Sequence, residues 1–235
     1  MAEAMKLDTL RGLNRARQER RAAIVVTDTV SGEERLVRGE AAATDPLAAE
    51  LQKRLFSARS GMHEDGRTFL TVQVPPPRLF VIGAVHISQA LAPMAKLAGF
   101  DVTIIDPRTA FATHERFPDV ELLAEWPEEA LKARPLDAYT ALAALTHDPK
   151  VDDHPILAAL TVRSFYVGAL GSRKTHGTRV ERLIAQGAAP ADIERIHAPI
   201  GIDIGSQSPA EIAVAILAEI IVALRRGRQA ERIAA

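Results

Sequence analysis

The pattern of apolar and polar positions changes at a run of three prolines, residues 75–77. Beyond it, short and almost wholly apolar runs alternate with longer amphipathic segments. The runs that we expect to be strands cover residues 79–82, 101–105, 120–123, 138–145 and 165–167. Apolar strands separated by helices are typical of a parallel sheet buried on both faces. The pattern therefore predicts an α/β fold, a Rossmann-like parallel sheet with helices on both faces, over residues 76–235.

The last amphipathic segment carries the clearest helix signals. Ser208 is a good N-cap, Pro209 suits the first helical position, and Glu211 completes a capping box. An apolar row then runs along one side of the segment, through Ile212, Ile216, Ile220 and Leu224. Gly227 follows two arginines, so we expect the helix to end there.

The first 75 residues have a different pattern. Residues 6–20 and 45–58 carry leucines at helical spacing, whereas residues 23–29 and 68–74 are typical of strands. Three consecutive prolines cannot continue a helix and favour an extended linker. We therefore expect a short N-terminal α+β region over residues 1–75, separate from the larger domain.

A glycine turn follows the first strand of the larger domain. Gly83 suits a tight turn between strand and helix, Ser88 is small enough to pack closely, and Asp106 ends the next strand. This order resembles the dinucleotide-binding fingerprint, in which such an acid bonds a ribose hydroxyl. Val85 stands where the second glycine of that fingerprint admits a pyrophosphate. The turn therefore supports the fold, and Val85 argues against ordinary NAD(P) binding.

A second glycine turn follows the strand at 165–167. Gly171 precedes Ser172, which is expected to cap a helix, and Arg173 and Lys174 begin that helix. The free N–H groups of a helix N-terminus bind anions, and two cations strengthen the effect. The alternative is an ordinary capped surface helix whose basic side chains are solvated.

Polar loops follow two further segments. His147, Asp148 and Asp152 follow an apolar strand, at the edge where open α/β sheets place their sites. A metal site there is one alternative, and a capped loop with Asp153 as the next helix's N-cap is the other. Farther on, the loop 197–205 offers His197 and Asp203 for acid–base chemistry or for a structural role.

Composition narrows the functional classes. The 235 residues contain no cysteine, which excludes disulfides, thiolate metal sites and cysteine nucleophiles. A net charge of −1 favours neither nucleic acid nor an anionic membrane. No apolar run reaches the length of a membrane span and no signal peptide is recognisable, so we expect a cytoplasmic protein. Neither a G-x-S-x-G elbow nor a Walker lysine motif is present, so the sequence supports neither an acyl-transfer enzyme nor a P-loop nucleotide site.

Several of these stretches, taken in order, resemble the C-terminal domain of the XdhC/CoxI family. The resemblance covers about residues 75–227, and its motifs are residues 76–79, the Gly83 turn with His86, and residues 145–150, 166–176, 197–205 and 208–213. Members are accessory factors for molybdenum hydroxylases such as xanthine dehydrogenase and carbon monoxide dehydrogenase. Several long motifs in the right order are more specific than one glycine turn.

The resemblance implies a role without turnover. Family members are thought to bind the molybdenum cofactor, guard it while it acquires its terminal sulfur, and assist its insertion into the target enzyme. The cofactor's pterin carries a phosphate, or a nucleotide joined through a pyrophosphate. The implied cofactor contacts are Gly83, His86, Asp106, His147, Gly171, Ser172, Arg173, His176 and Asp203. The implied partners are the hydroxylase and a sulfurtransferase or a fuller family paralogue. Because parallel Rossmann domains often pair and the basic N-terminal helix offers an interface, we also expect a homodimer.

Two departures from the family pattern keep other functions open. Val85 replaces the second glycine of the family's G-A-G-H turn, and the short N-terminal region lacks the family's serine-glycine-glycine-cysteine motif. Without a thiolate the chain has no soft ligand for molybdenum, and we expect no metal site. The alternatives are an NAD(P)-dependent oxidoreductase on the same fold and a docking scaffold that has lost ligand binding.

Overall fold

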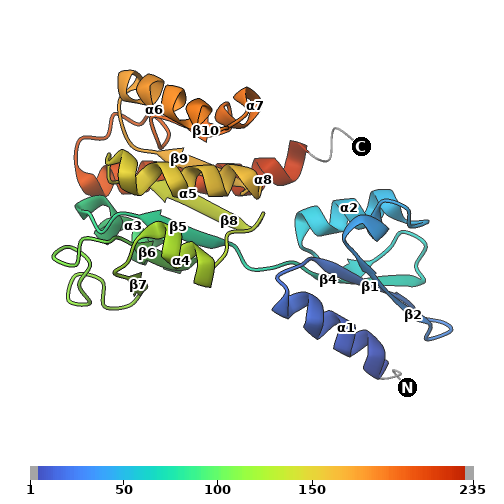
Figure 1. Ribbon diagram of the computed structural model, residues 1–235. Helices are drawn as coiled ribbons and strands as arrows, with labels where there is room; N and C mark the ends of the chain where they lie inside the picture. The colour runs from blue at the N-terminus through green and yellow to red at the C-terminus, as the bar shows by residue number, and fades with distance from the viewer. Residues whose placement is uncertain (1–4, 231–235) are drawn as a thin grey trace. The chain divides into compact units, whose positions relative to one another are not determined.

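The computed structural model describes residues 5–230 (Figure 1). The chain divides into two compact units. One consists of residues up to Pro75 together with residues from Arg226 on, and the other of Pro76–Arg225. The division within the chain therefore falls in the proline run, and each unit is described by itself.

The N-terminal unit is a four-stranded antiparallel sheet with a helix on each face. Its elements are α1 (Leu7–Gln18), β1 (Ala23–Asp28), β2 (Glu34–Arg38), the 3-10 turn η1 (Gly39–Ala42), α2 (Ala48–Ser57), β3 (Gly61–Met62) and β4 (Thr68–Gln73). The strand order is β2-β1-β4-β3. In β1, Ile24 and Val26 pack towards α2, whereas Ala23 and Val25 pack towards α1. Burial on both faces explains why β1 is apolar at successive positions.

The larger unit alternates strands and helices. Its elements are β5 (Arg78–Ile82), α3 (His86–Leu97), β6 (Asp101–Ile105), β7 (Glu121–Leu123), α4 (Pro127–Ala133), β8 (Thr140–Ala144), α5 (Pro149–Thr161), β9 (Tyr166–Ala169), α6 (Arg173–Ala185), α7 (Pro190–Ile193), β10 (Ile196–His197) and α8 (Pro209–Ala230). All the strand pairs of this sheet are parallel.

The order of the six strands is β10-β9-β8-β5-β6-β7. Numbered within the unit, this is the 3-2-1-4-5-6 order of the Rossmann fold read from the other edge. The order in which successive strands are added to the sheet reverses at β5 and β8, which pair in parallel from Arg78 opposite Thr140 to Ile82 opposite Ala144. The predicted fold class is therefore confirmed, and the topology places a switch point where β5 and β8 end.

Helices cover both faces of this sheet. Leu79 and Val81 of β5 pack into one core with α3 and α8, whereas Phe80 and Ile82 pack into another with α4, α5 and α6. Figure 1 shows α5 in front of the strands and α8 behind them. Because each strand contributes to both cores, the strands are apolar at every position, as the sequence pattern predicted.

The capping predictions are confirmed at two helices. The N–H of Thr175 donates to Ser172 Oγ at the start of α6 (3.2 Å). At α8, the N–H of Glu211 donates to Ser208 Oγ (3.2 Å) and the N–H of Ser208 donates to Glu211 Oε2 (3.2 Å), which completes the capping box.

Three local predictions were wrong. Helix α5 begins at Pro149 with Asp148 as its N-cap, so Asp153 lies inside the helix. Helix α8 continues to Ala230, past Gly227, because one helical glycine costs only about 1 kcal/mol. His197 ends the short strand β10 instead of lying in a loop. A two-residue strand has too few positions to show a period, which is why the sequence did not reveal it.

In the described part of the chain, no helix is both long and apolar enough to span a membrane.

Glycine at position 83 is required by both conformation and space. Its φ is +116°, and a Cβ would lie 2.8 Å from Thr146 Cγ2. We expect Gly83→Ala to lower the free energy of unfolding by about 1–3 kcal/mol. The matched control is Gly177→Ala inside α6, where a Cβ meets no atom within 4 Å, and this variant is expected to gain up to about 1 kcal/mol. Urea denaturation measures both, and equal stability of the two variants contradicts the assignment.

Candidate functional site

The candidate site lies at the carboxyl edge of the parallel sheet, where β5, β8 and β9 end. Open α/β sheets bind their ligands in the crevice at such a switch point. Gly83 follows β5 and lies against Thr146, which follows β8. Gly171 follows β9, and a Cβ at this position would lie 3.7 Å from His147 Nδ1. The sheet thus brings Gly83, His147 and Gly171 to one edge.

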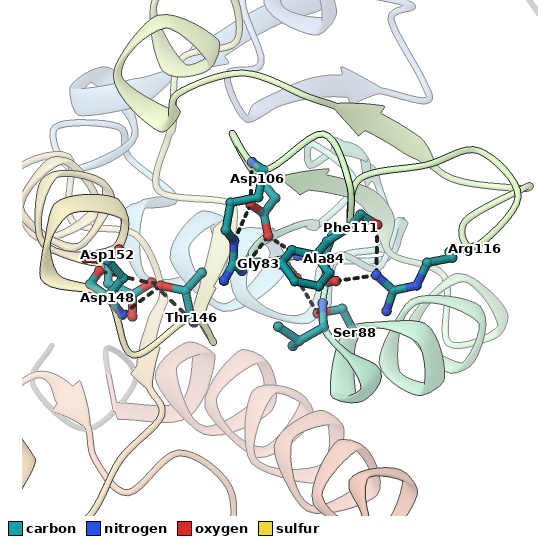
Figure 2. A network of polar contacts seen from close by, with 11 residues as sticks. Gly83, Ala84, Ser88, Asp106, Phe111, Arg116, Thr146, Asp148 and Asp152 are labelled. Atoms are coloured by element: carbon teal, nitrogen blue, oxygen red, sulfur yellow. Dashed lines mark hydrogen bonds and ion pairs between the residues drawn. The ribbon is translucent and has the colours of Figure 1, made fainter.

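Asp106 is hydrogen-bonded to the first glycine turn (Figure 2) and is fully buried. Its Oδ2 accepts from the N–H of Ala84 (2.7 Å) and from Arg108 Nη2 (2.7 Å), and its Oδ1 accepts from Arg108 Nε and N–H (2.9 Å each). Burial raises the pKa of Asp106, but the hydrogen bonds from Arg108 and Ala84 outweigh it and hold the pKa below its usual value. The carboxylate predicted for a ribose hydroxyl is therefore bonded on both oxygens within the chain.

Arg116 fixes the other side of the same turn. Its Nη1 donates to the carbonyl oxygens of Ala84 (2.9 Å) and Phe111 (2.8 Å), and its Nη2 donates to Gln89 Oε1 (2.8 Å). Figure 2 shows Arg116 and Asp106 approaching the turn from different sides. These bonds hold the segment after β6 onto the start of α3, so the glycine turn is hydrogen-bonded from both sides.

Val85 is the N-cap residue of α3 and packs against the core shared by α3 and α8. Its backbone is extended, with φ −105°, so glycine is not needed for conformation here. The side chain is therefore engaged at least partly in packing within the chain. Its effect on a bound pyrophosphate stays a prediction.

The loop after β8 is held by hydrogen bonds between neighbouring residues. Thr146 Oγ1 donates to Asp152 Oδ1 (2.7 Å) and accepts from the N–H of Asp148 (3.0 Å). His147, between them, is exposed and has a φ of +63°. The left-handed region is uncommon for residues other than glycine, and such strain is concentrated at functional sites. The strained histidine is thus presented to solvent beside the second glycine turn.

The second turn is shaped by Gly171, whose φ is +130°. Ser172 and Arg173 are exposed at the start of α6, where the first N–H groups have no partner within the helix. Lys174 and Thr175 line a cavity between α5 and α6 together with His147. The basic end of α6 is therefore available to a ligand through Lys174, while Arg173 does not line this cavity.

Two buried ionisable side chains line this cavity, and each has buried atoms without a hydrogen-bond partner in the described structure. Asp152 is 1% exposed and Arg179 is 2% exposed. Asp152 Oδ2 and Arg179 Nε and Nη1 lack partners in the described structure, and so does Nδ1 of the half-buried His176. Burial raises the pKa of Asp152 to about 6, against hydrogen bonds from Thr146 and the charge of Arg179. Burial and the charge of Arg179 lower the pKa of His176, which favours the neutral form of its ring.

A separate network joins β9, β10 and α8. Glu219 Oε2 accepts from the hydroxyl of Tyr166 (2.6 Å) and the N–H of Gly201 (2.7 Å), and Oε1 lies 3.1 Å from His197 Nδ1. Burial raises the pKa of Glu219, but the hydrogen bonds from His197 and Tyr166 outweigh it and lower the pKa. Glu219 thereby ties the loop after β10 to the last helix and orients the ring of His197.

The sequence-predicted residues therefore fall into groups. Gly83, Asp106, His147 and Gly171 share one edge of the sheet, and Ser172, Arg173 and His176 belong to the adjoining end of α6. His86 is exposed in the first turn of α3. Asp203 is exposed in the loop after β10 and accepts from the N–H of Gly205 (3.2 Å). In the described residues, no three of His, Cys, Asp or Glu are grouped to hold a metal ion.

Sequence reasoning missed Arg108, Arg116, Arg179 and Glu219. Glu219 had a usable signal, because it is an acid beside the apolar row of the last helix. Arg179 had none, since a basic residue within a polar helix is typical of a solvated face. Only packing against α5 shows that Arg179 is buried.

Comparison with known proteins identifies the family. Residues 79–220, more than half of the chain, match the model of the XdhC Rossmann domain. The chain belongs to the XdhC family. The predicted resemblance is thereby confirmed for the part of this XdhC chain that holds the glycine turns and the cavity.

Relatives share this XdhC region with moderate identity. The chain is 32% identical over 167 residues to a Bacillus subtilis protein named as a probable xanthine dehydrogenase subunit, and 29% identical over 176 residues to the molybdenum cofactor insertion chaperone PaoD of Escherichia coli. These matches cover 70% and 75% of the chain and 48% of each relative, so it spans about half their length. A crystal structure named a xanthine dehydrogenase, from Bacillus halodurans, has the same fold, with a TM-score of 0.68 and 21% identity over 95% of this chain and 68% of that one.

The buried charge of Asp152 is expected to cost stability. With a pKa of about 6 when folded and 3.8 when unfolded, the folded state binds more protons between these values. The free energy of unfolding therefore falls as the pH rises from about 4 to about 6. We expect Asp152→Asn to be more stable than the wild type by about 2–3 kcal/mol at pH 7, with the gain vanishing towards pH 4.

Urea denaturation at pH 4, 5, 6 and 7 measures this effect. The control is Asp148→Asn, since Asp148 is exposed and asparagine caps a helix equally well. Its stability is expected to follow the wild type at every pH. An Asp152→Asn variant that is less stable than the wild type at pH 7 shows that the ionised carboxylate stabilises the fold.

Proposed function

We propose that this chain binds the molybdenum cofactor and delivers it to a molybdenum hydroxylase. The relatives support this proposal through their names, a molybdenum cofactor insertion chaperone and a probable xanthine dehydrogenase subunit. The cofactor is then cargo that enters and leaves, so the chain needs an open site and no catalytic centre of its own.

The observation that carries the proposal is the crevice itself. This crevice is the cavity between α5 and α6. Its lining includes the buried and incompletely bonded Asp152 and Arg179 together with Lys174, and through His147 it adjoins the second glycine turn. A buried polar group without a hydrogen-bond partner costs free energy, so such groups favour a polar ligand that satisfies them. A cofactor that combines a phosphate with a polar ring system offers both hydrogen-bond donors, which Asp152 lacks, and acceptors, which Arg179 lacks.

The oxidoreductase alternative has less support from the geometry. The ribose of a nicotinamide nucleotide would require Asp106, whose two oxygens already accept four hydrogen bonds. Binding in the usual way would also bring the pyrophosphate against Val85. A nucleotide would have to displace Arg108 from a carboxylate buried at 0% exposure.

The proposal is tested by anaerobic calorimetry with molybdenum cofactor released from a purified hydroxylase, and by activation of the cofactor-free hydroxylase. NAD⁺ and NADP⁺ are titrated in parallel. We expect cofactor binding to weaken about tenfold in Lys174→Ala, because a charge-assisted contact to the cofactor is lost. The matched control is Lys132→Ala, an exposed lysine of α4 that is paired with Glu129. It is expected to bind as the wild type does.

Each contrary outcome identifies a different function. Binding of a nicotinamide nucleotide without binding of the molybdenum cofactor overturns the proposal in favour of the oxidoreductase. Binding of no ligand, together with capture of the hydroxylase, favours the docking scaffold.

A further inference from the structure

A cavity of about 260 Å³ lies between α5 and α6. Its walls include Asp152 from α5 and Lys174, Thr175 and Arg179 from α6, and it reaches His147 at the end of β8. One water molecule occupies about 30 Å³ of liquid, so this space is on the order of eight waters in size. It is large enough for a bicyclic ring.

Asp152 and Arg179 are each anchored at one end and unpaired at the other. The unpaired atoms are themselves buried, so a ligand in the cavity bonds them once the two side chains turn towards it. Asp152 Oδ1 accepts from Thr146 Oγ1 (2.7 Å), and Arg179 Nη2 donates to the carbonyl oxygen of Leu170 (2.9 Å). The remaining oxygen of Asp152 and two remaining nitrogens of Arg179 have no partner among the described residues. The two charges interact, yet neither satisfies the other's open atoms.

The neighbouring ion pair has no such opening. Arg182 donates from Nε to Asp153 Oδ2 (2.7 Å) and from Nη2 to Asp153 Oδ1 (3.1 Å), a closed bidentate pair between the same two helices. Helices α5 and α6 therefore form one fully hydrogen-bonded ion pair, Asp153 with Arg182. Beside it they bring together Asp152 and Arg179, an incomplete pair whose remaining polar atoms have no partner among the described residues. A ligand for the incomplete pair needs a hydrogen-bond donor for the carboxylate and, beside it, an acceptor for the guanidinium.

We propose that this cavity binds the aminopyrimidinone edge of a pterin, with Asp152 Oδ2 accepting from the ring N–H or amino group and Arg179 donating to the ring carbonyl. The inference rests on the proposed function and names the part of the cofactor that this pocket holds. A simple oxyanion suits the pocket less well, because the open oxygen of Asp152 repels it. Guanine carries the same edge, so a guanine base is a second source of the same chemistry.

The edge is probed directly by the fluorescence of 6-hydroxymethylpterin, titrated into the full chain at pH 7. We expect saturable quenching, and at least tenfold weaker binding of lumazine, whose oxo group replaces the 2-amino donor. Guanosine is added as a competitor. Displacement of the pterin by guanosine supports the same edge, and tighter binding of guanosine than of the pterin assigns the pocket to a guanine base.

The protein side is tested with Asp152→Asn and the control Asp148→Asn. We expect at least tenfold weaker pterin binding by Asp152→Asn and a change of less than twofold in the control. Because Asp152→Asn is expected to be the more stable protein at pH 7, a loss of binding with a raised melting temperature is not a folding defect. Lys174→Ala, an exposed position on the same cavity, is the second variant, with an expected loss of about threefold.

Three outcomes overturn the inference. These are equal pterin binding by Asp152→Asn and the wild type, equal binding of lumazine and 6-hydroxymethylpterin, and displacement of the pterin by inorganic phosphate with tighter phosphate binding in Asp152→Asn. Activation of a cofactor-free hydroxylase separates this inference from the proposed function. If wild type and Asp152→Asn both activate it equally, only the pterin pocket is wrong. If the wild type fails to activate it and does not bind the molybdenum cofactor, the proposed function is wrong.

Discussion

The contact between Gly83 and Thr146 determines the geometry of the candidate site. No side chain separates the ends of β5 and β8, because a Cβ at Gly83 would come within 2.8 Å of Thr146. Thr146 is thereby fixed where its hydroxyl reaches Asp152 and the N–H of Asp148. The first turn of α5 and the conformation of His147 both follow from that placement. One missing side chain at the switch point thus positions the loop and helix that form one side of the crevice.

Two carboxylate–guanidinium pairs flank this contact, and they differ in one physical respect. Asp106 and Arg108 satisfy each other and close the space behind the first turn. Asp152 and Arg179 are 1% and 2% exposed, whereas the Arg108 side chain is 38% exposed, and the buried pair lines a cavity with atoms that lack hydrogen-bond partners. Replacing an incomplete buried pair by apolar residues often stabilises a protein, so its presence is weak evidence for a stabilising role. The closed pair fits a structural role, and the open pair fits the binding of a polar ligand at the expense of stability.

Membership of the XdhC family fits this division between scaffold and site. The Rossmann sheet and its two cores are built from ordinary apolar strands and helices, and fold alone does not determine function. Under the proposed function, ligand binding depends on a few polar groups at the carboxyl edge of the sheet.

The sequence by itself determined the parts that follow from local pattern. Apolar runs predicted the parallel sheet, since strands buried on both faces need apolar residues throughout, and capping residues predicted the starts of α6 and α8. Gly83 and Gly171 were recognisable because each follows a strand and precedes a helix. The family was recognisable from motifs whose order along the chain was intact.

Only the tertiary structure decided which polar side chains are buried and which of their atoms remain open. Arg179 and Arg182 lie on the same polar helix, yet one is 2% exposed with open nitrogens and the other is closed on Asp153. From its position in the sequence, Asp106 was predicted to bond a ribose hydroxyl. In the structure, the oxygens of its carboxylate accept hydrogen bonds from Arg108 and Ala84. Burial and hydrogen-bond partners depend on how α5, α6 and the loop after β6 pack. Contacts between residues far apart in sequence leave no periodic pattern along the chain.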